Sequence, residues 1–433
     1  MLVAGVFTRA AVASPDVTLR VAPERDYVYS GGSREVIVQI DLDGKRPERG
    51  RRAPMNLAVV LDRSGSMQGA KLEKAKQGAC VAIDHLADDD YFSLVMFDTD
   101  TEVLLPPERV GGGRNRDALK ARIDRVRTGG GTAIHAGVAL GAQQVRRHFD
   151  REFVNRIVLL SDGIANVGPC RTSDLAALGR DLRRDGLSVT TIGVGDDYNE
   201  DLMTALAEAS NANYYYVRDA EKLPGIFAEE LGAARTLVAR GVTIRITVPD
   251  GVRIKEIIGQ PEIQCHGRSA DIALPEYFGG DKRRFLVRCA VESKASDPLE
   301  VAAVDLKYEP SQGGRAEPQQ QAARIQFTDE EKKSEDSLRV EVAREVAIAN
   351  NRLAKEMAVK LADEGRSKDA ADVLRRQAVQ NSAVPAPAQV PGLAIENRKL
   401  EDAAREVESQ GQLGKSTRKQ VQYENYQDKY KKR

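Results

Sequence analysis

The segment from 56 to 78, which reads NLAVVLDRSGSMQGAKLEKAKQG, holds three small oxygen-bearing side chains at alternate positions directly after an apolar run. They are Asp62, Ser64 and Ser66. Gly65 allows a tight turn, so these side chains are expected to point into one concavity. Carboxylate and hydroxyl oxygens, with no cysteine or histidine among them, are typical ligands of a hard cation. Mg²⁺ is the first choice, with Mn²⁺ or Ca²⁺ as alternatives.

Such a cation takes about six oxygen ligands, so further ligands must come from other loops. RTGGGTAIHAG places Thr132 behind three glycines, and RIVLLSDGIAN places Asp162 at the end of the apolar run 157–160. Open α/β sheets bind their ligands where the carboxyl ends of neighbouring parallel strands meet. The sequence therefore predicts a metal site of two carboxylates and three hydroxyls on three loops: Asp62, Ser64, Ser66, Thr132 and Asp162.

The apolar pattern predicts the sheet that must position these loops. Short runs rich in Val, Ile and Leu occur at 58–61, 91–97, 157–160 and 189–194. Runs without alternation are typical of strands covered on both faces, and the stretches between them are amphipathic. The first of these stretches has an apolar stripe from Leu72 to Leu86, and Lys71 faces away from it. Further helices are expected at about 114–127, 133–148, 173–185, 199–210 and 221–237. A doubly wound, mainly parallel α/β domain, Rossmann-like in architecture, is thus predicted over residues 55–237.

On both sides of this domain, alternating apolar and polar residues predict half-buried strands. Residues 16–54 and 238–328 are assigned to one antiparallel β-sandwich, which the α/β domain adjoins or into which it is inserted. A helical hairpin is predicted over 329–382, with Met357 in its apolar stripe. Residues 383–433 are assigned to a Pro/Ala linker, a helix and a polar, mobile tail, so the chain ends in a helical extension.

Composition excludes several classes of function. Lys plus Arg and Asp plus Glu number 65 each, so no net charge attracts nucleic acid or an anionic membrane. No apolar run reaches the length of a spanning helix. The four cysteines show no zinc-type spacing. Cys265 and Cys289 are interpreted either as a disulfide or as two buried thiols.

The first residues, 1–15, read MLVAGVFTRAAVASP and are interpreted as the remnant of a secretory signal. A frayed start of the chain is the alternative. An extracytoplasmic location, periplasmic or secreted, is favoured over a cytoplasmic one.

No catalytic constellation is predicted, so the chain is not expected to be an enzyme. His85 and His135 are interpreted as structural or surface residues, because sequence order yields no Ser-His-Asp arrangement. A phosphotransferase with an aspartyl nucleophile requires a second Asp where this chain has Ser64. The glycine runs 111–113 and 129–131 lack the lysine of a phosphate-binding loop.

The ordered pattern D-x-S-x-S, a Thr in a Gly-rich turn and a strand-terminal S-D-G resembles the metal-ion-dependent adhesion site (MIDAS) of the von Willebrand factor A (VWA) domain family. The resemblance implies that Ser64, Ser66 and Thr132 hold the cation directly, and that Asp62 and Asp162 hold it directly or through water. It also implies that a Glu or Asp of a partner protein takes the open position. The whole arrangement is similar to bacterial secreted A-domain proteins that are distantly similar to inter-alpha-trypsin inhibitor heavy chains.

The expected function is metal-dependent protein binding, as a cell-adhesion or scaffold module. One alternative is a regulatory or chaperone-like subunit that docks on an ATPase or a metal-insertion complex through the same domain. Another is a vestigial site in which Ser64 and Thr132 only cap helices.

Overall fold

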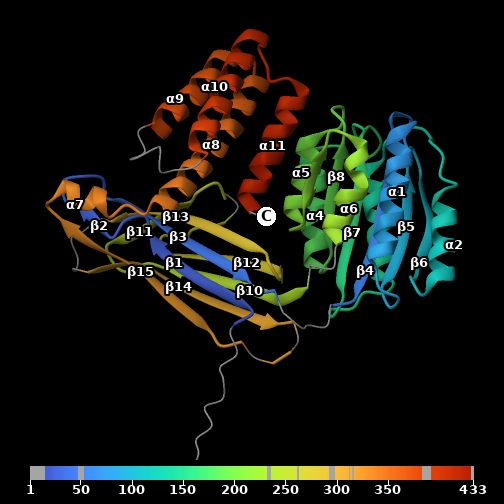
Figure 1. Cartoon of the computed structure of the whole chain (residues 1–433), viewed down its shortest axis with the longest axis horizontal. Coiled ribbons are helices and arrows are strands. Elements are labelled where there is room, and N and C mark those ends of the chain that lie inside the picture. Colours follow the sequence, from blue (N-terminus) through green and yellow to red (C-terminus); the bar gives the residue numbers. More distant parts are fainter. Residues whose placement is uncertain are drawn as a thin grey trace, which may run out of the picture.

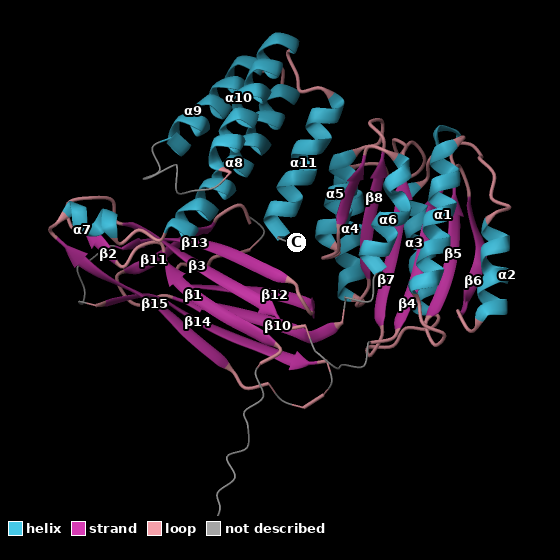
Figure 2. Ribbon diagram, viewed as in Figure 1, coloured by secondary structure: helices cyan, strands magenta, loops and turns pink. Residues whose placement is uncertain are grey.

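The computed structural model describes residues 15–46, 53–231, 236–260, 263–291, 298–311, 313–314, 316–382 and 392–430. Its three parts are a β-sandwich, an α/β domain beside it, and a group of C-terminal helices that lies mainly above the sandwich in the view of Figure 1. The last helix of the group faces the α/β domain (Figure 2). The predicted signal remnant and Pro/Ala linker fall largely outside the described residues, at 1–14 and 383–391.

The α/β domain is built on a six-stranded sheet in the order β6-β5-β4-β7-β8-β9. Its strands are β4 (Met55–Asp62), β5 (Tyr91–Phe97), β6 (Thr101–Arg109), β7 (Val154–Ser161), β8 (Ser188–Val194) and β9 (Tyr214–Val217). Every neighbouring pair is parallel except β5 with β6. The predicted doubly wound, mainly parallel sheet is therefore confirmed.

Helices cover both faces of this sheet, and each face has its own apolar core. They are α1 (Ala70–His85), α2 (Gly113–Ile123) and α6 (Leu223–Leu231) on one face, and α3 (Ile134–Arg146), α4 (Thr172–Arg184) and α5 (Glu200–Ala209) on the other. The helix expected over 221–237 is shorter than predicted. It ends at Leu231, and Leu237 already begins a strand of the sandwich.

The β-sandwich consists of two sheets with one shared apolar core. One sheet has the order β1-β3-β13-β11 and the other β12-β10-β14-β15-β2. Their strands are β1 (Val17–Pro23), β2 (Tyr27–Tyr29), β3 (Glu35–Gly44), β10 (Leu237–Thr247), β11 (Val252–Ile257), β12 (Ser269–Phe278), β13 (Lys282–Val291), β14 (Leu299–Pro310) and β15 (Gln319–Thr328). The first three strands precede the α/β domain and the others follow it, so the domain is inserted into the sandwich.

The C-terminal helices are α7 (Glu331–Asp336), α8 (Val340–Asp363), α9 (Ser367–Ser382), α10 (Leu393–Gln410) and α11 (Lys415–Tyr430). The long helices α8, α9 and α10 share an apolar core. Met357 is not part of it, because this residue is 49% exposed, contrary to the predicted stripe. None of the described helices is both long and apolar enough to cross a membrane.

The prediction of a mobile tail over residues 423–433 is wrong for 423–430, which belong to helix α11. The sequence of this helix is polar, but several of its charged residues have partners on α5. Arg418 and Lys419 both pair with Glu200. Tyr426 is buried and donates a hydrogen bond to the Ala212 carbonyl oxygen. Tertiary ion pairs thus keep a polar helix in place.

The cysteines of the sandwich match the alternative of two buried thiols in that neither is bridged, although Cys265 is only half-buried. Cys289 is buried in the sandwich core, Cys265 packs against the same core, and both are free.

Candidate metal centre

The first strand of the α/β domain ends in the site. Every residue of β4 is buried, including its last residue, Asp62. One oxygen of the Asp62 carboxylate accepts a hydrogen bond from the Ser64 backbone N–H at 2.7 Å. The other accepts one from the Ser161 hydroxyl, at the end of β7. This carboxylate therefore joins the loops after two adjacent parallel strands.

The hydroxyls of the first loop connect it to the second carboxylate. The Ser64 and Ser66 hydroxyl oxygens lie 3.1 Å apart, and Ser66 donates to Asp162 Oδ1 at 2.7 Å. Ser64 and Asp162 are buried, whereas Ser66 is exposed. The cluster therefore opens to solvent at Ser66.

Thr132 reaches the same place from the glycine-rich loop. Its backbone N–H donates to Asn166 Oδ1 at 2.8 Å, and the Asn166 N–H donates back to its carbonyl oxygen at 3.1 Å. A Cβ atom on Gly163 would lie 2.9 Å from the Thr132 hydroxyl and 3.5 Å from the Ser66 hydroxyl. Both hydroxyls thus converge on the glycine that follows Asp162. The structure brings all five predicted site residues together.

The glycine-rich loop is held against the first loop by backbone hydrogen bonds. The Gly129 N–H donates to the Arg63 carbonyl oxygen at 2.6 Å, and the Gly65 N–H donates to the Gly130 carbonyl oxygen at 3.2 Å. A side chain at Gly129 would collide with the carboxylate of Asp98. Glycine is needed there because the Asp98 carboxylate already occupies the position that a side chain would take.

Four further residues shape the site although the sequence predicts no role for them: Lys71, Asp98, Ser161 and Asn166. Ser161 lies next to Asp162, and the S-D-G motif could have pointed to it. Asp98 orients Arg63, with its carboxylate 2.9 Å from the guanidinium Nε. Asp98 and Asn166 act through contacts between distant loops, which no local pattern reveals.

Lys71 was expected to face away from the apolar stripe of its helix, and it does so by turning toward the site. It lies in the first turn of α1, and its ammonium donates a hydrogen bond to Asp162 Oδ2. The side chain of Asp162 is fully buried, while that of Lys71 is 32% exposed. Lys71 is therefore the cationic group that contacts the buried carboxylates among the described residues.

The electrostatics of the site favour an added cation. Asp62 and Asp162 are both fully buried. Burial raises the pKa of the Asp62 carboxyl to about 6, because water no longer stabilises its charged form. A divalent cation at the cluster would stabilise both carboxylates in the charged form.

The donor set fits such a cation. Octahedral Mg²⁺ holds its ligands at about 2.1 Å, so neighbouring ligand oxygens lie about 3.0 Å apart. The hydroxyl oxygens of Ser64 and Ser66 are 3.1 Å apart, and that of Ser66 is 2.7 Å from Asp162 Oδ1, close to this spacing. The described residues contain no group of three His, Cys, Asp or Glu that could hold a metal ion. A cation here would therefore depend on the hydroxyls.

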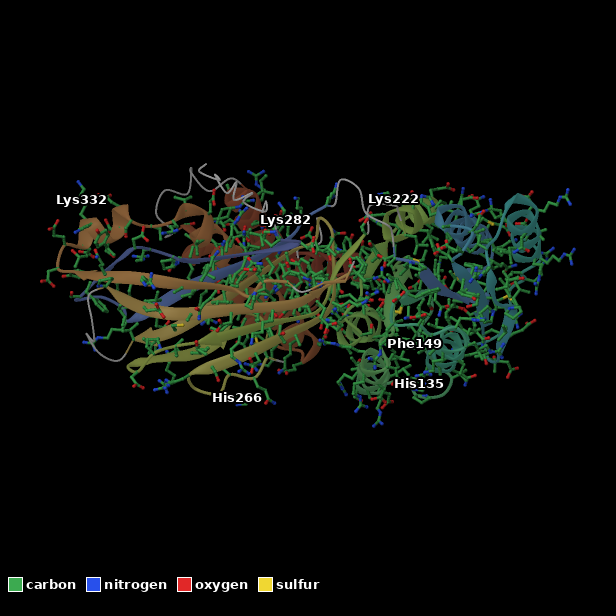
Figure 3. The ribbon with its side chains drawn as sticks, turned by 90° about the horizontal axis from the view of Figure 1, so that it is seen from below. His135, Phe149, Lys222, His266, Lys282 and Lys332 are labelled. Atoms are coloured by element: carbon green, nitrogen blue, oxygen red, sulfur yellow. The ribbon has the colours of Figure 1, made fainter. Side chains whose placement is uncertain are left out.

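The two histidines considered as bases lie apart from this chemistry. His85 Nδ1 is 2.9 Å from the Val81 carbonyl oxygen, one turn back in its own helix. His135 lies at the periphery of the α/β domain (Figure 3). Both positions suit structural or surface residues.

Comparison with known proteins agrees with this architecture. Residues 56–229 match the family model of the von Willebrand factor type A domain. The uncharacterised protein sll0103 of Synechocystis sp. is 34% identical over 42% of this chain and 42% of its own length. YfbK of Escherichia coli is 26% identical over 49% of this chain and 37% of its own length. Inter-alpha-trypsin inhibitor heavy chain H3 of Rattus norvegicus is 24% identical over 36% of this chain and 18% of its own length. Each match spans less than half of the relative.

Two solved structures share the fold over nearly the whole chain. The von Willebrand factor type A structure from Catenulispora acidiphila has a TM-score of 0.71 at 19% identity, covering 96% of this chain and 97% of that one. The ArnB paralog VWA2 from Sulfolobus acidocaldarius has a TM-score of 0.59 at 16% identity, covering 95% of this chain and 98% of that one. Residues 56–229 of this chain are therefore a von Willebrand factor type A domain, a kind of domain that commonly mediates protein interactions.

Proposed function

We propose that this domain binds its protein partner through a divalent cation, Mg²⁺ first. The cation would be held by Asp62, Ser64, Ser66, Thr132 and Asp162, and a Glu or Asp of the partner would complete its ligands. The observation that carries the proposal is the contact of two buried carboxylates with hydroxyls from separate loops, at a place that opens to solvent at Ser66.

The charge of the site supports an acidic partner. Two carboxylates can at most balance a dication, and the ammonium of Lys71 adds a positive charge beside Asp162. The cation would therefore keep affinity for one more carboxylate. The protein's own side chains bind and orient in this proposal, and none of them acts as a nucleophile or base.

The first test is cation binding to the full chain, measured with Mn²⁺ by electron paramagnetic resonance and with Mg²⁺ by calorimetry. We expect one site per chain. Asp62→Ala should abolish it because the substitution removes a carboxylate that no other side chain replaces. Asp89→Ala is the matched control, since this exposed aspartate lies in the loop before β5, at the opposite edge of the sheet. Equal Mn²⁺ binding by wild type and Asp62→Ala would contradict the proposed site.

The second test is partner binding. Immobilised wild-type protein is exposed to an extract in Mg²⁺ or in chelator, and a protein retained only with Mg²⁺ is purified and mixed with the chain again. Binding should weaken in Thr132→Ala and be lost in Asp62→Ala. It should also depend on one Glu or Asp of the partner. Binding that survives chelator and Asp62→Ala would show that another surface is used.

A further inference from the structure

Lys71 contacts two loops at the carboxyl edge of the sheet. Its ammonium donates to Asp162 Oδ2 on one side. On the other side it lies against Gly195, where an added Cβ would be 3.6 Å from Lys71 Nζ. Gly195 has φ 73° and begins the loop between β8 and α5. One lysine therefore bridges the metal site and a loop that carries no predicted metal ligand.

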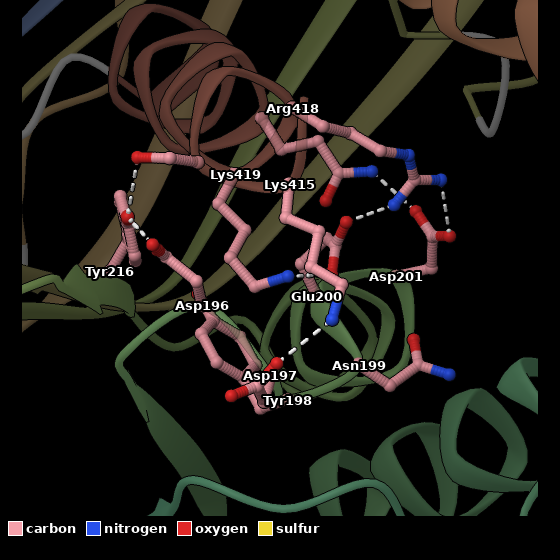
Figure 4. A network of polar contacts seen from close by, with 12 residues as sticks. Asp196, Asp197, Tyr198, Asn199, Glu200, Asp201, Tyr216, Lys415, Arg418 and Lys419 are labelled. Carbon is pink, nitrogen blue, oxygen red and sulfur yellow. Dashed lines mark hydrogen bonds and ion pairs between the residues drawn. The ribbon is translucent and has the colours of Figure 1, made fainter. Parts of the chain in front are cut away.

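The C-terminal helix α11 holds the far side of this loop (Figure 4). Lys415, the first residue of α11, pairs with Asp197 at 2.9 Å. Tyr216 donates to Asp196 at 2.5 Å, and its hydroxyl lies 3.3 Å from that of Ser416. The loop from 195 to 199 thus lies between Lys71 and the first turn of α11.

Asp197 is within electrostatic reach of both lysines. The hydrogen bond and the charge of Lys415 lower the pKa of the Asp197 carboxyl, and the charge of Lys71 adds to the effect. Lys71 thus contacts one acidic residue, Asp162, and lies against Gly195, two positions before a second acidic residue, Asp197. Asp197 is also neutralised by Lys415.

The body of α11 is anchored more firmly than its first turn. Arg418 pairs with Glu200 and Asp201, and Lys419 pairs with Glu200 in a contact that is almost fully buried. Lys415 and Asp197 are instead 73% and 70% exposed. Exposed pairs contribute little to stability, so the first turn can release Asp197 while the rest of α11 stays docked.

We propose that Lys71 is a tethered cation that competes with the divalent cation for Asp162, and that Lys415 of α11 sets the strength of this competition through Asp197. The inference rests on the proposed metal site. While Lys415 neutralises Asp197, Lys71 has Asp162 as its main partner and weakens cation binding. When Asp197 is released, Lys71 turns to it and leaves Asp162 to the cation. By linkage, cation binding loosens the first turn of α11 by the same factor.

The experiment measures Mn²⁺ affinity for single variants of the full chain. Lys71→Gln should bind about tenfold more tightly, the scale on which residues behind metal ligands alter affinity. Lys415→Gln should bind about threefold more tightly and Asp197→Asn about threefold more weakly, as expected for the energy of one exposed pair. Lys429→Gln is the control, because it removes the same charge at the other end of α11. It should leave Mn²⁺ affinity unchanged.

Double variants separate the inference from long-range electrostatics. In the Lys71→Gln background, Lys415→Gln and Asp197→Asn should no longer change Mn²⁺ affinity. Persistence of either effect would show that these charges act on the cation directly and would overturn the inference. So would unchanged affinity in all three single variants, provided that wild type binds Mn²⁺. Absence of Mn²⁺ binding in both wild type and Lys71→Gln would overturn the proposed metal site itself.

Hydrogen exchange gives a second readout on the intact chain. Saturating Mg²⁺ should speed amide exchange in the first turn of α11 by about threefold, the reciprocal of the effect on affinity. The Lys71→Gln protein should show no such change. Equal exchange with and without Mg²⁺ in a wild type that binds the ion would contradict the coupling.

Discussion

The two ends of the VWA sheet both bury carboxylates, but they balance the charge differently. At the amino end, Glu230 of α6 is fully buried and accepts hydrogen bonds from Arg156 at 2.7 Å, Thr190 at 2.7 Å, Asn213 at 2.5 Å and Tyr215 at 2.9 Å. The Arg156 side chain is itself only 4% exposed. The protein supplies the cation and the donors at this end, so the cluster can serve as a permanent part of the structure.

At the carboxyl end, two buried carboxylates share weaker support. Asp62 receives one backbone N–H and the Ser161 hydroxyl, and Asp162 receives the Ser66 hydroxyl and Lys71. No arginine contacts either carboxylate among the described residues. A buried carboxylate without a full counter-charge is costly, so this end gains from a cation that enters from solvent.

The position of the sandwich matches this division. The chain enters the VWA domain at β4 and leaves it after α6, both at the amino end of the sheet. Arg156 also lies over the ring of Phe278 in β12, 5.4 Å from its centroid. The sandwich is thus attached at the amino end of the sheet, and of the parts outside the domain only α11 reaches the carboxyl end among the described residues.

The largest expected effect on stability comes from breaking the buried ion pair of Arg156 with Glu230. Arg156→Met leaves Glu230 buried without its cation, and we expect the free energy of unfolding to fall by about 3–5 kcal/mol in guanidinium titrations. Arg171→Met is the control, because its pair with Asp174 is exposed and surface pairs contribute about 0–1 kcal/mol. A loss below 1 kcal/mol for Arg156→Met would remove the contrast between the two ends.

The second effect is the increase in stability that a cation bound at the carboxyl end should give. At about one hundred times its dissociation constant, Mg²⁺ should stabilise the wild type by about 2.7 kcal/mol, seen as a rise in melting temperature that chelator reverses. Asp162→Asn keeps the shape but removes charge, so it should shift the required Mg²⁺ to higher concentration. Arg156→Met should keep the full Mg²⁺ gain. A melting temperature indifferent to Mg²⁺ and chelator would favour a vestigial site.

Sequence patterns predicted the parts of the fold that have strong periodicity. The buried runs identified β4, β5, β7 and β8, whereas β6 contains Pro106 and Pro107 and was missed. Strand β9 has only four residues, too few for a period. The five proposed ligands could be predicted because D-x-S-x-S, the Gly-rich turn and S-D-G are local motifs.

The remaining contacts of the site and the docking of α11 depend on residues that are far apart in sequence. Lys71 meets Asp162 only because α1 begins at the same sheet edge at which β7 ends. The partners of Arg418 and Lys419 on α5 are more than two hundred positions away. A single sequence carries no signal for such pairs. The polar composition of residues 423–433 therefore predicted a mobile tail where α11 continues.

The smallest expected effect on stability concerns α11, which contacts the VWA domain at both ends of its sheet. It meets the carboxyl end through Lys415 and the amino end through Tyr426, whose hydroxyl donates to the Ala212 carbonyl oxygen before β9. Tyr426→Phe should destabilise the docked helix by about 1 kcal/mol, the usual value of one hydrogen bond. Hydrogen exchange along α11 measures the change.

Tyr423→Phe is the matched control for this last prediction. Both rings pack edge-on against Tyr214, but the Tyr423 hydroxyl has no hydrogen bond in the described part of the chain. Because Tyr426 acts at the amino end, its loss should speed exchange in the last turns of α11 and leave Mn²⁺ affinity unchanged. Lys415→Gln should do the opposite, with tighter Mn²⁺ binding and unchanged exchange in the last turns. If Tyr426→Phe altered Mn²⁺ affinity as much as Lys415→Gln, α11 would act as one rigid unit and the two ends of the sheet would not be independent.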